Sequence, residues 1–161
     1  MPTSSQDINV PALAEELRST LEGDVQFDDG TRALYATDSS NYRQVPIGVV
    51  SPKSKNDVIA TIAACRKFGA PLLSRGAGTS LAGQCCNVAV IIDWKKHLNR
   101  ILEINPGARY ARVEPGAVCD DLRRAAAGHS LTWGPDPATH THCTFGGMLG
   151  NNSCGAHAQM N

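Results

Sequence analysis

The sequence predicts an α+β fold, in which a small parallel βαβ lobe is followed by the beginning of a second, mixed α+β lobe. Two observations lead to this class. A clear helix pattern lies between two short apolar runs, which is the order of a right-handed parallel crossover. Further along the chain, two short apolar runs flank a Pro-Gly turn and precede a second helix pattern, which indicates mixed structure.

The first predicted element is an amphipathic helix over residues 11–21, where Leu13, Leu17 and Leu21 recur at fourfold spacing. We expect this helix to cover the lobe that follows it. Aspartate, glycine and serine then mark turns around a short helix predicted at residues 31–36. The N-terminal part is therefore expected to be helical and peripheral.

The clearest helix lies between the strands predicted at residues 49–50 and 71–73. Ser54 and Asp57 resemble a capping box at its start, and Gly69 is a typical C-terminal stop. Its apolar side chains are expected to share one face, which carries Val58, Ile59, Ile62 and Cys65 and ends at Phe68. Strand, helix and strand together form the predicted parallel crossover.

Three more strands are predicted from apolar runs at residues 88–93, 101–104 and 111–114. The sequence Asn105-Pro106-Gly107 separates the last two, as in a hairpin. A second long helix is predicted at residues 118–127, before a segment dense in proline and glycine. These elements would begin the second lobe.

A glycine-rich loop, Ser74 to Gly83, directly follows the strand at residues 71–73. Glycine permits positive φ and close backbone approach, so successive NH groups can turn toward one pyrophosphate. The hydroxyls of Thr79 and Ser80 add two donors. Ligands of open α/β sheets lie outside the carboxyl ends of the strands, which is where this loop begins. The loop therefore predicts a phosphate site.

Two common phosphate loops do not fit these residues. A dinucleotide fingerprint needs a third glycine where Leu81 stands, and a nucleoside-triphosphate loop needs Lys and Ser or Thr where Gln84 and Cys85 stand. Residues 81–87 are also too few for a crossover helix before the next strand. Loop NH groups, rather than a helix N-terminus, are therefore expected to hold the phosphates.

A second candidate segment comprises Pro135-Asp136-Pro137 and residues 143–155. Proline fixes φ, glycine allows close approach, and Asn and Ser side chains can meet a polar ring edge or a phosphate. Taken alone, either candidate segment is equally compatible with an ordinary surface turn.

Composition narrows the classes of function. The chain has 161 residues, with 15 Lys plus Arg and 15 Asp plus Glu, so it has no global attraction for nucleic acid or an anionic membrane. No apolar run is long enough to span a membrane, and residues 1–9 lack a signal pattern, so we expect a cytoplasmic protein.

Six cysteines are expected to be reduced thiols in that compartment, and none lies in an iron–sulfur run. Cys154 and His157 have a spacing that suits zinc. Because a second Cys-x-x-Cys pair is missing, we assign no metal site. A noncatalytic metal- or nucleotide-binding domain remains the alternative function; its candidate ligands are His140, His142, Cys143, Cys154 and His157.

Five separated motifs, in this order and spacing, resemble the FAD-binding domain of the vanillyl-alcohol oxidase and p-cresol methylhydroxylase superfamily. The chain is most similar to the D-lactate, glycolate and D-2-hydroxyglutarate dehydrogenase branch, especially proteins in which the flavin module is fused to a C-terminal iron–sulfur domain. The resemblance covers about residues 45–157. The motifs are Arg75 to Ser80, Val88 to Asp93, Val113 to Gly116, Gly134 to Pro137 and Thr144 to Asn152.

The resemblance implies a p-cresol methylhydroxylase-type (PCMH-type) FAD-binding fold. Residues 1–44 would be an N-terminal helical cover segment and residues 45–161 an FAD-binding domain that is incomplete at its C-terminal end, so that the chain is an N-terminal fragment. Residues 75–80 would wrap the pyrophosphate, and the second segment would line the flavin. The cofactor-binding residues expected are Arg75, Gly76, Ala77, Gly78, Thr79, Ser80, Gly83, Pro135, Asp136, Pro137, Thr144, Gly146, Gly147, Asn151, Asn152, Ser153 and Gly155.

Some members attach FAD covalently through a histidine at the position of Thr79, so the resemblance implies noncovalent FAD here. The implied reaction is oxidation of a small 2-hydroxy acid by hydride transfer to flavin, with an electron acceptor that the sequence does not identify. The catalytic residues are unknown and are expected downstream. An iron–sulfur cluster, where the protein has one, would belong to the missing C-terminal part.

Overall fold

The computed structural model describes residues 8–157, and the chain divides into two compact units that meet between Asp93 and Trp94. The expectations for the N-terminal residues 1–7 and for the chain end at residues 158–161 lie outside the described residues. The domain boundary proposed between residues 44 and 45 stays a prediction.

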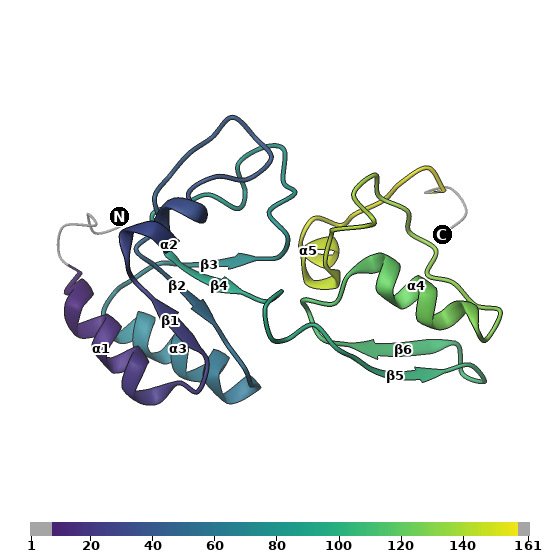
Figure 1. The fold of residues 1–161 in the computed structure, drawn as a ribbon, viewed down its shortest axis with the longest axis horizontal. Coiled ribbons are helices and arrows are strands. Elements are labelled where there is room, and N and C mark those ends of the chain that lie inside the picture. Colours follow the sequence, from purple (N-terminus) through teal and green to yellow (C-terminus); the bar gives the residue numbers. More distant parts are fainter. Residues whose placement is uncertain (1–7, 158–161) are drawn as a thin grey trace. The chain divides into compact units, whose positions relative to one another are not determined.

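The first unit contains a four-stranded sheet with the order β1-β2-β4-β3 (Figure 1). Its strands are β1 (Asp24–Gln26), β2 (Gly48–Ser51), β3 (Leu72–Arg75) and β4 (Val90–Asp93). Strands β2, β4 and β3 are parallel, and β1 is antiparallel to β2. The predicted parallel crossover from β2 to β3 is confirmed, and β4 lies between these two strands.

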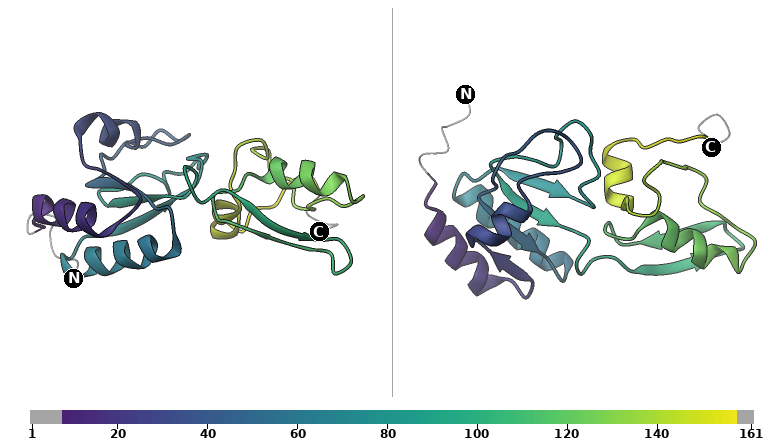
Figure 2. Two further views of the ribbon diagram at one scale, coloured as in Figure 1. Left: turned by 60° about the horizontal axis from the view of Figure 1, so that its bottom comes forward. Right: turned by 45° about the horizontal axis from the view of Figure 1, so that its top comes forward.

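Three helices flank this sheet. α1 (Val10–Thr20) and α3 (Lys55–Lys67) lie side by side on one face, and α2 (Asp29–Leu34) lies on the other (Figure 2). Every residue of β2 and β4 is buried, as expected for the central strands of a parallel sheet. The core between the sheet and the paired helices contains Leu13, Leu17, Val50, Ala64, Cys65 and Val90.

The start of α3 forms as predicted, because the Ser54 hydroxyl accepts a hydrogen bond from the Asp57 amide at 3.1 Å. The buried Asp57 carboxylate also accepts from the amides of Lys53 (2.8 Å) and Glu22 (3.1 Å). It thereby ties the chain before β1 to this helix. The helix ends at Lys67, and Gly69, which follows the C-cap residue Phe68, has a φ of +67°.

The predicted apolar face of α3 is partly wrong. Ile59 and Ile62 are 55% and 47% exposed, while the face turned to the core carries the small side chains of Thr61, Ala64 and Cys65. The Thr61 hydroxyl is buried but not left without a hydrogen-bond partner, because it donates to the Asp57 carbonyl at 2.7 Å. Small side chains allow the helix to pack closely on the sheet.

The second unit contains an antiparallel hairpin and two helices. β5 (Ile101–Asn105) pairs with β6 (Tyr110–Val113), α4 (Cys119–Ala127) covers the hairpin, and α5 (Phe145–Gly150) follows a long irregular segment (Figure 1). The core consists of Ala117, Leu122 and Phe145 packed on Ile101, Ile104 and Val113. The hairpin and α4 confirm the prediction from sequence.

The helix α5 was not predicted, because its glycines indicate a loop. It begins after Thr144, whose hydroxyl accepts from the Gly147 amide at 3.4 Å. Phe145 and Met148 lie three positions apart and are both buried. Their burial stabilises a helical turn that local propensity disfavours.

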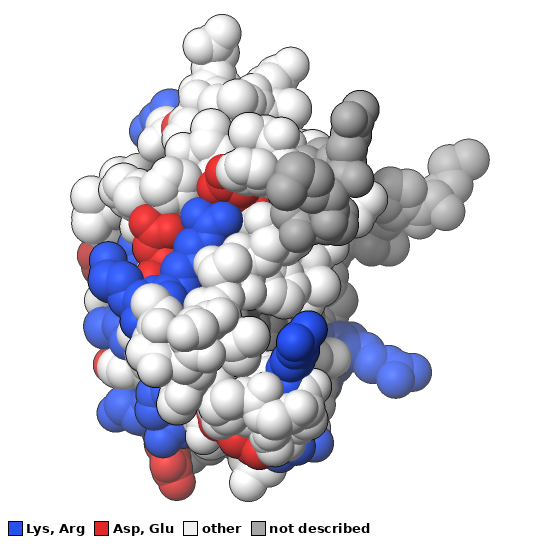
Figure 3. Space-filling view, turned by 90° about the vertical axis from the view of Figure 1, so that its right-hand side faces the viewer, with Lys and Arg blue, Asp and Glu red and all other residues white. Residues whose placement is uncertain are grey.

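Acidic and basic side chains lie next to one another on the face drawn in Figure 3, in keeping with their equal numbers in the sequence. In the part of the chain that the structure describes, no helix is long and apolar enough to cross a membrane.

Acidification is expected to loosen the hairpin through Glu114. The Arg100 side chain donates to this buried carboxylate at 2.7 Å, and these hydrogen bonds lower the pKa of Glu114. Because the folded pKa lies below the unfolded value of about 4.3, the contribution is present above that pH and is lost as the pH falls through the folded pKa. Glu114→Gln should therefore flatten the acid dependence of hydrogen exchange in β5 and β6.

The exchange rates are corrected for their intrinsic pH dependence and measured in the full natural polypeptide by mass spectrometry. Glu103→Gln is the matched control, because the Glu103 carboxylate accepts from the Tyr110 hydroxyl at 2.6 Å. An equal acid dependence in wild type and Glu114→Gln would assign it to other groups.

Candidate functional site

The glycine-rich loop leaves the carboxyl end of β3, and the chain then returns to the amino end of the parallel strand β4 (Figure 1). No helix forms between the two strands, as expected from the short spacing. Gly78 and Gly83 have φ values of +70° and +78°, a conformation that favours glycine. The loop therefore has the conformational features that the sequence predicts.

Several NH groups of this loop are available for a ligand. Within the first unit, no described residue accepts a hydrogen bond from the backbone NH groups of Ala77, Gly78, Thr79 or Ser80. Gly78 and Ser80 are buried, and buried backbone donors are nearly always paired. A run of unpaired donors at the carboxyl end of a parallel sheet fits an anionic ligand such as a pyrophosphate.

Arg75 braces this loop. Its guanidinium donates to the carbonyls of Thr37 (2.7 Å), Cys85 (3.0 Å) and Tyr35 (3.2 Å), and it lies 5.2 Å from the centre of the Tyr35 ring. A Cβ added to Gly78 would lie 2.6 Å from this guanidinium. The geometry favours support of the loop over direct phosphate binding by Arg75, and a direct contact stays a prediction.

The segment from Tyr35 to Tyr42 contacts the same loop, although the sequence predicts only the end of a short helix at residue 36 and a turn at residues 38–41. The amide of Ser39 donates to the Gly78 carbonyl at 3.1 Å, and the Asp38 carboxylate accepts from the Cys85 amide at 3.3 Å. A Cβ on Gly83 would meet the Tyr42 ring at 2.7 Å. The polar run at residues 38–41 was the available signal, but its partners lie about forty positions away in sequence.

Tyr35 also connects this segment to the end of β4. Its hydroxyl donates to the Asp93 carboxylate at 2.5 Å, and burial, followed by this hydrogen bond, raises the pKa of Tyr35. The phenol therefore stays protonated and keeps its donor role at neutral pH. Asp93 pairs in register with Arg75, so Tyr35 supports the edge of the sheet at which the loop begins.

The two predicted hydroxyl donors differ in their surroundings. The Ser80 hydroxyl donates to the side-chain carbonyl of Gln84 at 2.5 Å, within the loop itself. Among residues 8–93, the Thr79 hydroxyl has no such partner. Thr79 is therefore the side chain best placed to add a donor to the NH groups of residues 77–80.

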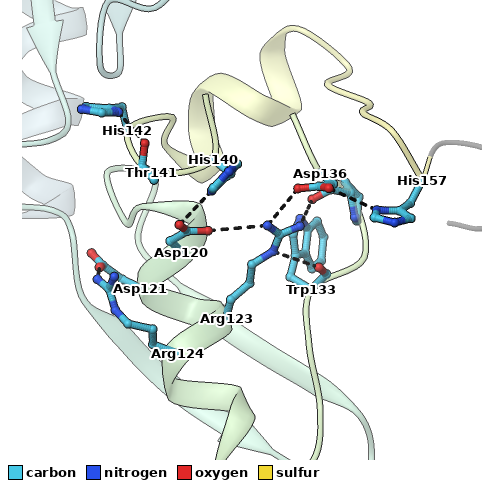
Figure 4. Close-up of polar contacts among 11 residues, drawn as sticks. Asp120, Asp121, Arg123, Arg124, Trp133, Asp136, His140, Thr141, His142 and His157 are labelled. Atoms are coloured by element: carbon cyan, nitrogen blue, oxygen red, sulfur yellow. Dashed lines mark hydrogen bonds and ion pairs between the residues drawn. The ribbon is translucent and has the colours of Figure 1, made fainter. Parts of the chain in front are cut away.

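The second candidate segment is held against α4 by Arg123 (Figure 4). The guanidinium donates to the Asp136 carboxylate and the Pro135 carbonyl, both at 3.0 Å, and to the Trp133 carbonyl at 3.3 Å. The Arg123 hydrogen bond lowers the pKa of Asp136. The predicted site residue Asp136 thus has a structural partner that the sequence did not reveal.

Residues 144–155 form α5 and the turn after it. The Gly146 amide donates to the Pro115 carbonyl at 2.8 Å, and a Cβ on Gly146 would lie 3.0 Å from that residue. A Cβ on Gly155 would lie 1.8 Å from the Asp136 carbonyl oxygen, so the backbones at Gly155 and Asp136 are in contact. Asn151 and Asn152 are exposed. The structure therefore brings Gly155 and Asp136, predicted separately, together.

A cavity of about 760 Å³ lies in the second unit between the hairpin, α4 and the segment that leads to α5. Trp133 and Phe145 meet edge to face in its lining, with ring centres 5.2 Å apart. The cavity lining also includes three of the predicted cofactor-binding residues: Pro135, Asn152 and Ser153. Its size and apolar lining are typical of sites for small organic ligands.

The histidines of the suspected zinc cluster have other partners. His140 Nδ1 lies 2.8 Å from the Asp120 carboxylate, and His157 Nδ1 lies 3.1 Å from the Asp136 carboxylate (Figure 4). Cys143 is buried and Cys154 exposed. Among residues 8–157, no three His, Cys, Asp or Glu side chains gather in a way that could hold a metal ion.

The chain is similar to a known family and to individual proteins of known name. Residues 46–161 match the model of a family described as FAD binding domain. The chain is 35% identical over 159 residues to D-2-hydroxyglutarate dehydrogenase of Pseudomonas putida, and 33% identical over 154 residues to the glycolate oxidase subunit GlcD of Escherichia coli. The matches cover 96% and 94% of this chain but only 16% and 31% of those proteins.

Solved structures share the fold. Alkyldihydroxyacetonephosphate synthase matches with a TM-score of 0.80 at 20% identity, over 92% of this chain and 31% of that one. p-Cresol methylhydroxylase matches with a TM-score of 0.73 at 20% identity, over 88% of this chain and 28% of that one. At this identity the likeness establishes the fold alone, and it confirms the predicted PCMH-type architecture.

Proposed function

Because this chain belongs to the FAD binding domain family, we propose that it is the FAD-binding part of a flavin-dependent oxidoreductase that oxidises a 2-hydroxy acid. The observation that carries the proposal is the run of unpaired NH groups at residues 77–80, at the carboxyl ends of β3 and β4. The relatives at 35% and 33% identity are named for D-2-hydroxyglutarate and glycolate, and both of these are 2-hydroxy acids.

The first unit would bind the pyrophosphate of FAD. Neutral donors would come from the NH groups of residues 77–80 and from the Thr79 hydroxyl. Arg75 would hold the loop in place through its hydrogen bonds to backbone carbonyls. Because a threonine hydroxyl lacks the nucleophilic ring nitrogen of histidine, we propose that Thr79 leaves FAD noncovalently bound. FAD supplies the hydride acceptor when it is bound.

The second unit would contact the flavin with residues 133–155. Arg123, Asp136 and His157 in this unit form hydrogen bonds with one another or with backbone carbonyls. We therefore propose that they hold the backbone of this segment in place and do not transfer protons. We assign no catalytic base to this chain. The groups that bind the substrate carboxylate, and the iron–sulfur cysteines of an electron-transfer domain, would belong to sequence beyond it, because the chain spans 16% to 31% of these relatives.

The substrate class is tested by anaerobic titration of the full natural polypeptide with D-lactate, glycolate and D-2-hydroxyglutarate. At least one of them should bleach the flavin absorption, and the L-enantiomers of the two chiral acids serve as controls. A flavin that dithionite reduces but no 2-hydroxy acid reduces would overturn the substrate class. That result would leave the proposal of FAD binding intact.

A further inference from the structure

We infer that Asp120 and Arg123 are positioning residues, which hold the flavin-facing segment of residues 133–157 against α4. We call this pair the α4 clasp. The inference rests on the proposed function only where it concerns FAD. Neither residue was a candidate from sequence, and each makes its contacts entirely within the second unit.

Arg123 is the centre of the clasp. Its side chain is 21% exposed and uses all three guanidinium nitrogens, donating to the Asp136 carboxylate and to the carbonyls of Pro135 and Trp133. A guanidinium is planar and carries donors in a fixed fork, so these three contacts fix both the position and the direction of the segment. A lysine has one nitrogen and cannot reproduce them.

Asp120 holds the next part of the same segment. It lies one helical turn before Arg123, and its carboxylate oxygen Oδ1 is 3.5 Å from a guanidinium nitrogen of Arg123. The other carboxylate oxygen, Oδ2, contacts His140 Nδ1 at 2.8 Å. The Asp120 amide also donates to the His140 carbonyl at 3.2 Å. The clasp therefore grips the chain at residues 133–136 and again at residue 140 (Figure 4).

The segment depends on these contacts because it has little regular structure of its own. Residues 131–137 form neither helix nor strand, and Pro135 and Pro137 lack the NH group that a ladder would need. The carbonyls of Trp133 and Pro135 are satisfied by Arg123 instead. An irregular segment with few backbone partners keeps one conformation only when side chains hold it.

The hold extends to the end of the described chain. His157 contacts the Oδ2 atom of the Asp136 carboxylate, whereas Arg123 contacts its Oδ1 atom, and the Gly155 backbone packs on the Asp136 backbone. Asp136 is therefore clamped between Arg123 on one side and residues 155–157 on the other. Loss of Arg123 would leave a carboxylate that is only 24% exposed without its cation.

The test replaces Arg123 and its neighbour Arg124 separately in the full natural polypeptide. Arg124 lies on the same helix, is 75% exposed and pairs with Asp121 alone, so Arg124→Met matches the change of charge and side chain without touching the clasp. We expect Arg123→Met to weaken FAD binding about tenfold or more and to speed hydrogen exchange in residues 131–140. Arg124→Met should stay within about twofold of wild type in both measurements.

A spectroscopic signature separates positioning from general destabilisation. Arg123→Lys keeps the charge and is the milder variant if Arg123→Met does not fold. In Arg123→Lys that retains FAD, the visible circular dichroism of the flavin should change, because its neighbouring segment has moved, whereas Arg124→Lys should leave the spectrum unaltered. Wild-type affinity, exchange and dichroism in Arg123→Lys would overturn the inference.

A double-mutant cycle gives a further test of the pair. If Arg123 acts through Asp136, then Asp136→Asn should cost much less FAD affinity in the Arg123→Met background than in wild type. Equal costs in both backgrounds would contradict the clasp. Wild-type protein without FAD would instead refute the proposed function, and the exchange of residues 131–140 would still decide whether the clasp holds this segment.

Discussion

Gly78→Val is expected to reduce FAD binding by the full natural polypeptide at least about 100-fold, because strain of about 3 kcal/mol would fall on the loop that carries the donors. The φ of Gly78 is +70°, which a β-branched residue rarely adopts, and a Cβ there would lie 2.6 Å from the Arg75 guanidinium. The variant would disturb both the positions of the NH groups of residues 77–80 and the hydrogen bonds by which Arg75 holds the loop. The dissociation constant is measured by quenching of flavin fluorescence.

Gly69→Val is the matched control for this prediction. Gly69 has a similar φ of +67°, but a Cβ there would meet nothing within 4 Å. The residue follows the C-cap of α3 and lies outside the glycine-rich loop. Its substitution should lower thermal stability while the folded protein keeps nearly wild-type affinity for FAD. Equal affinity losses in the two variants would mean that global strain, rather than the loop, controls binding.

Gly155→Ala is expected to disrupt the flavin-facing segment severely. The added Cβ would lie 1.8 Å from the Asp136 carbonyl oxygen and 2.1 Å from its carbon, and both are backbone atoms that no side-chain rotation can move. Overpacking of this kind costs about 3 kcal/mol or more, so FAD affinity should fall about 100-fold. The same fluorescence titration, with thermal unfolding alongside it, measures the effect.

Gly150→Ala provides the comparison. Gly150 lies at the end of α5, and a Cβ there would meet nothing within 4 Å. Since alanine favours a helix over glycine by about 1 kcal/mol, this variant should be as stable as wild type or more stable, with unchanged FAD affinity. A Gly155→Ala protein that matches Gly150→Ala in both measurements would show that the contact with Asp136 is not needed.

Local signals in the sequence predicted most of the first unit and the hairpin of the second. The cap at Ser54, the stop at Gly69 and the turn between β5 and β6 are encoded within a few residues, so their chemistry can be read directly. The position of β4 between β2 and β3 could not be read, because the order of strands in a sheet depends on contacts between distant segments. β1 has only three residues and no apolar run.

The same distinction holds for the candidate site. The conformation of Gly78 follows from residue type, and the resemblance of five motifs identified the family that the comparisons confirm. The partners of Arg75 and Arg123 lie ten to forty positions away in the sequence. They could not be predicted from the sequence, because most of them are backbone carbonyls, which every residue has. The exposure of Ile59 likewise depends on which face of α3 packs against the sheet.

The most direct measurement is the flavin content of the full natural polypeptide, by absorption of the purified protein followed by mass spectrometry of what heat releases from it. One FAD per chain, released without proteolysis, is the predicted result and would also establish noncovalent binding. A folded, colourless protein that takes up no added FAD would contradict the central claim that this chain binds FAD.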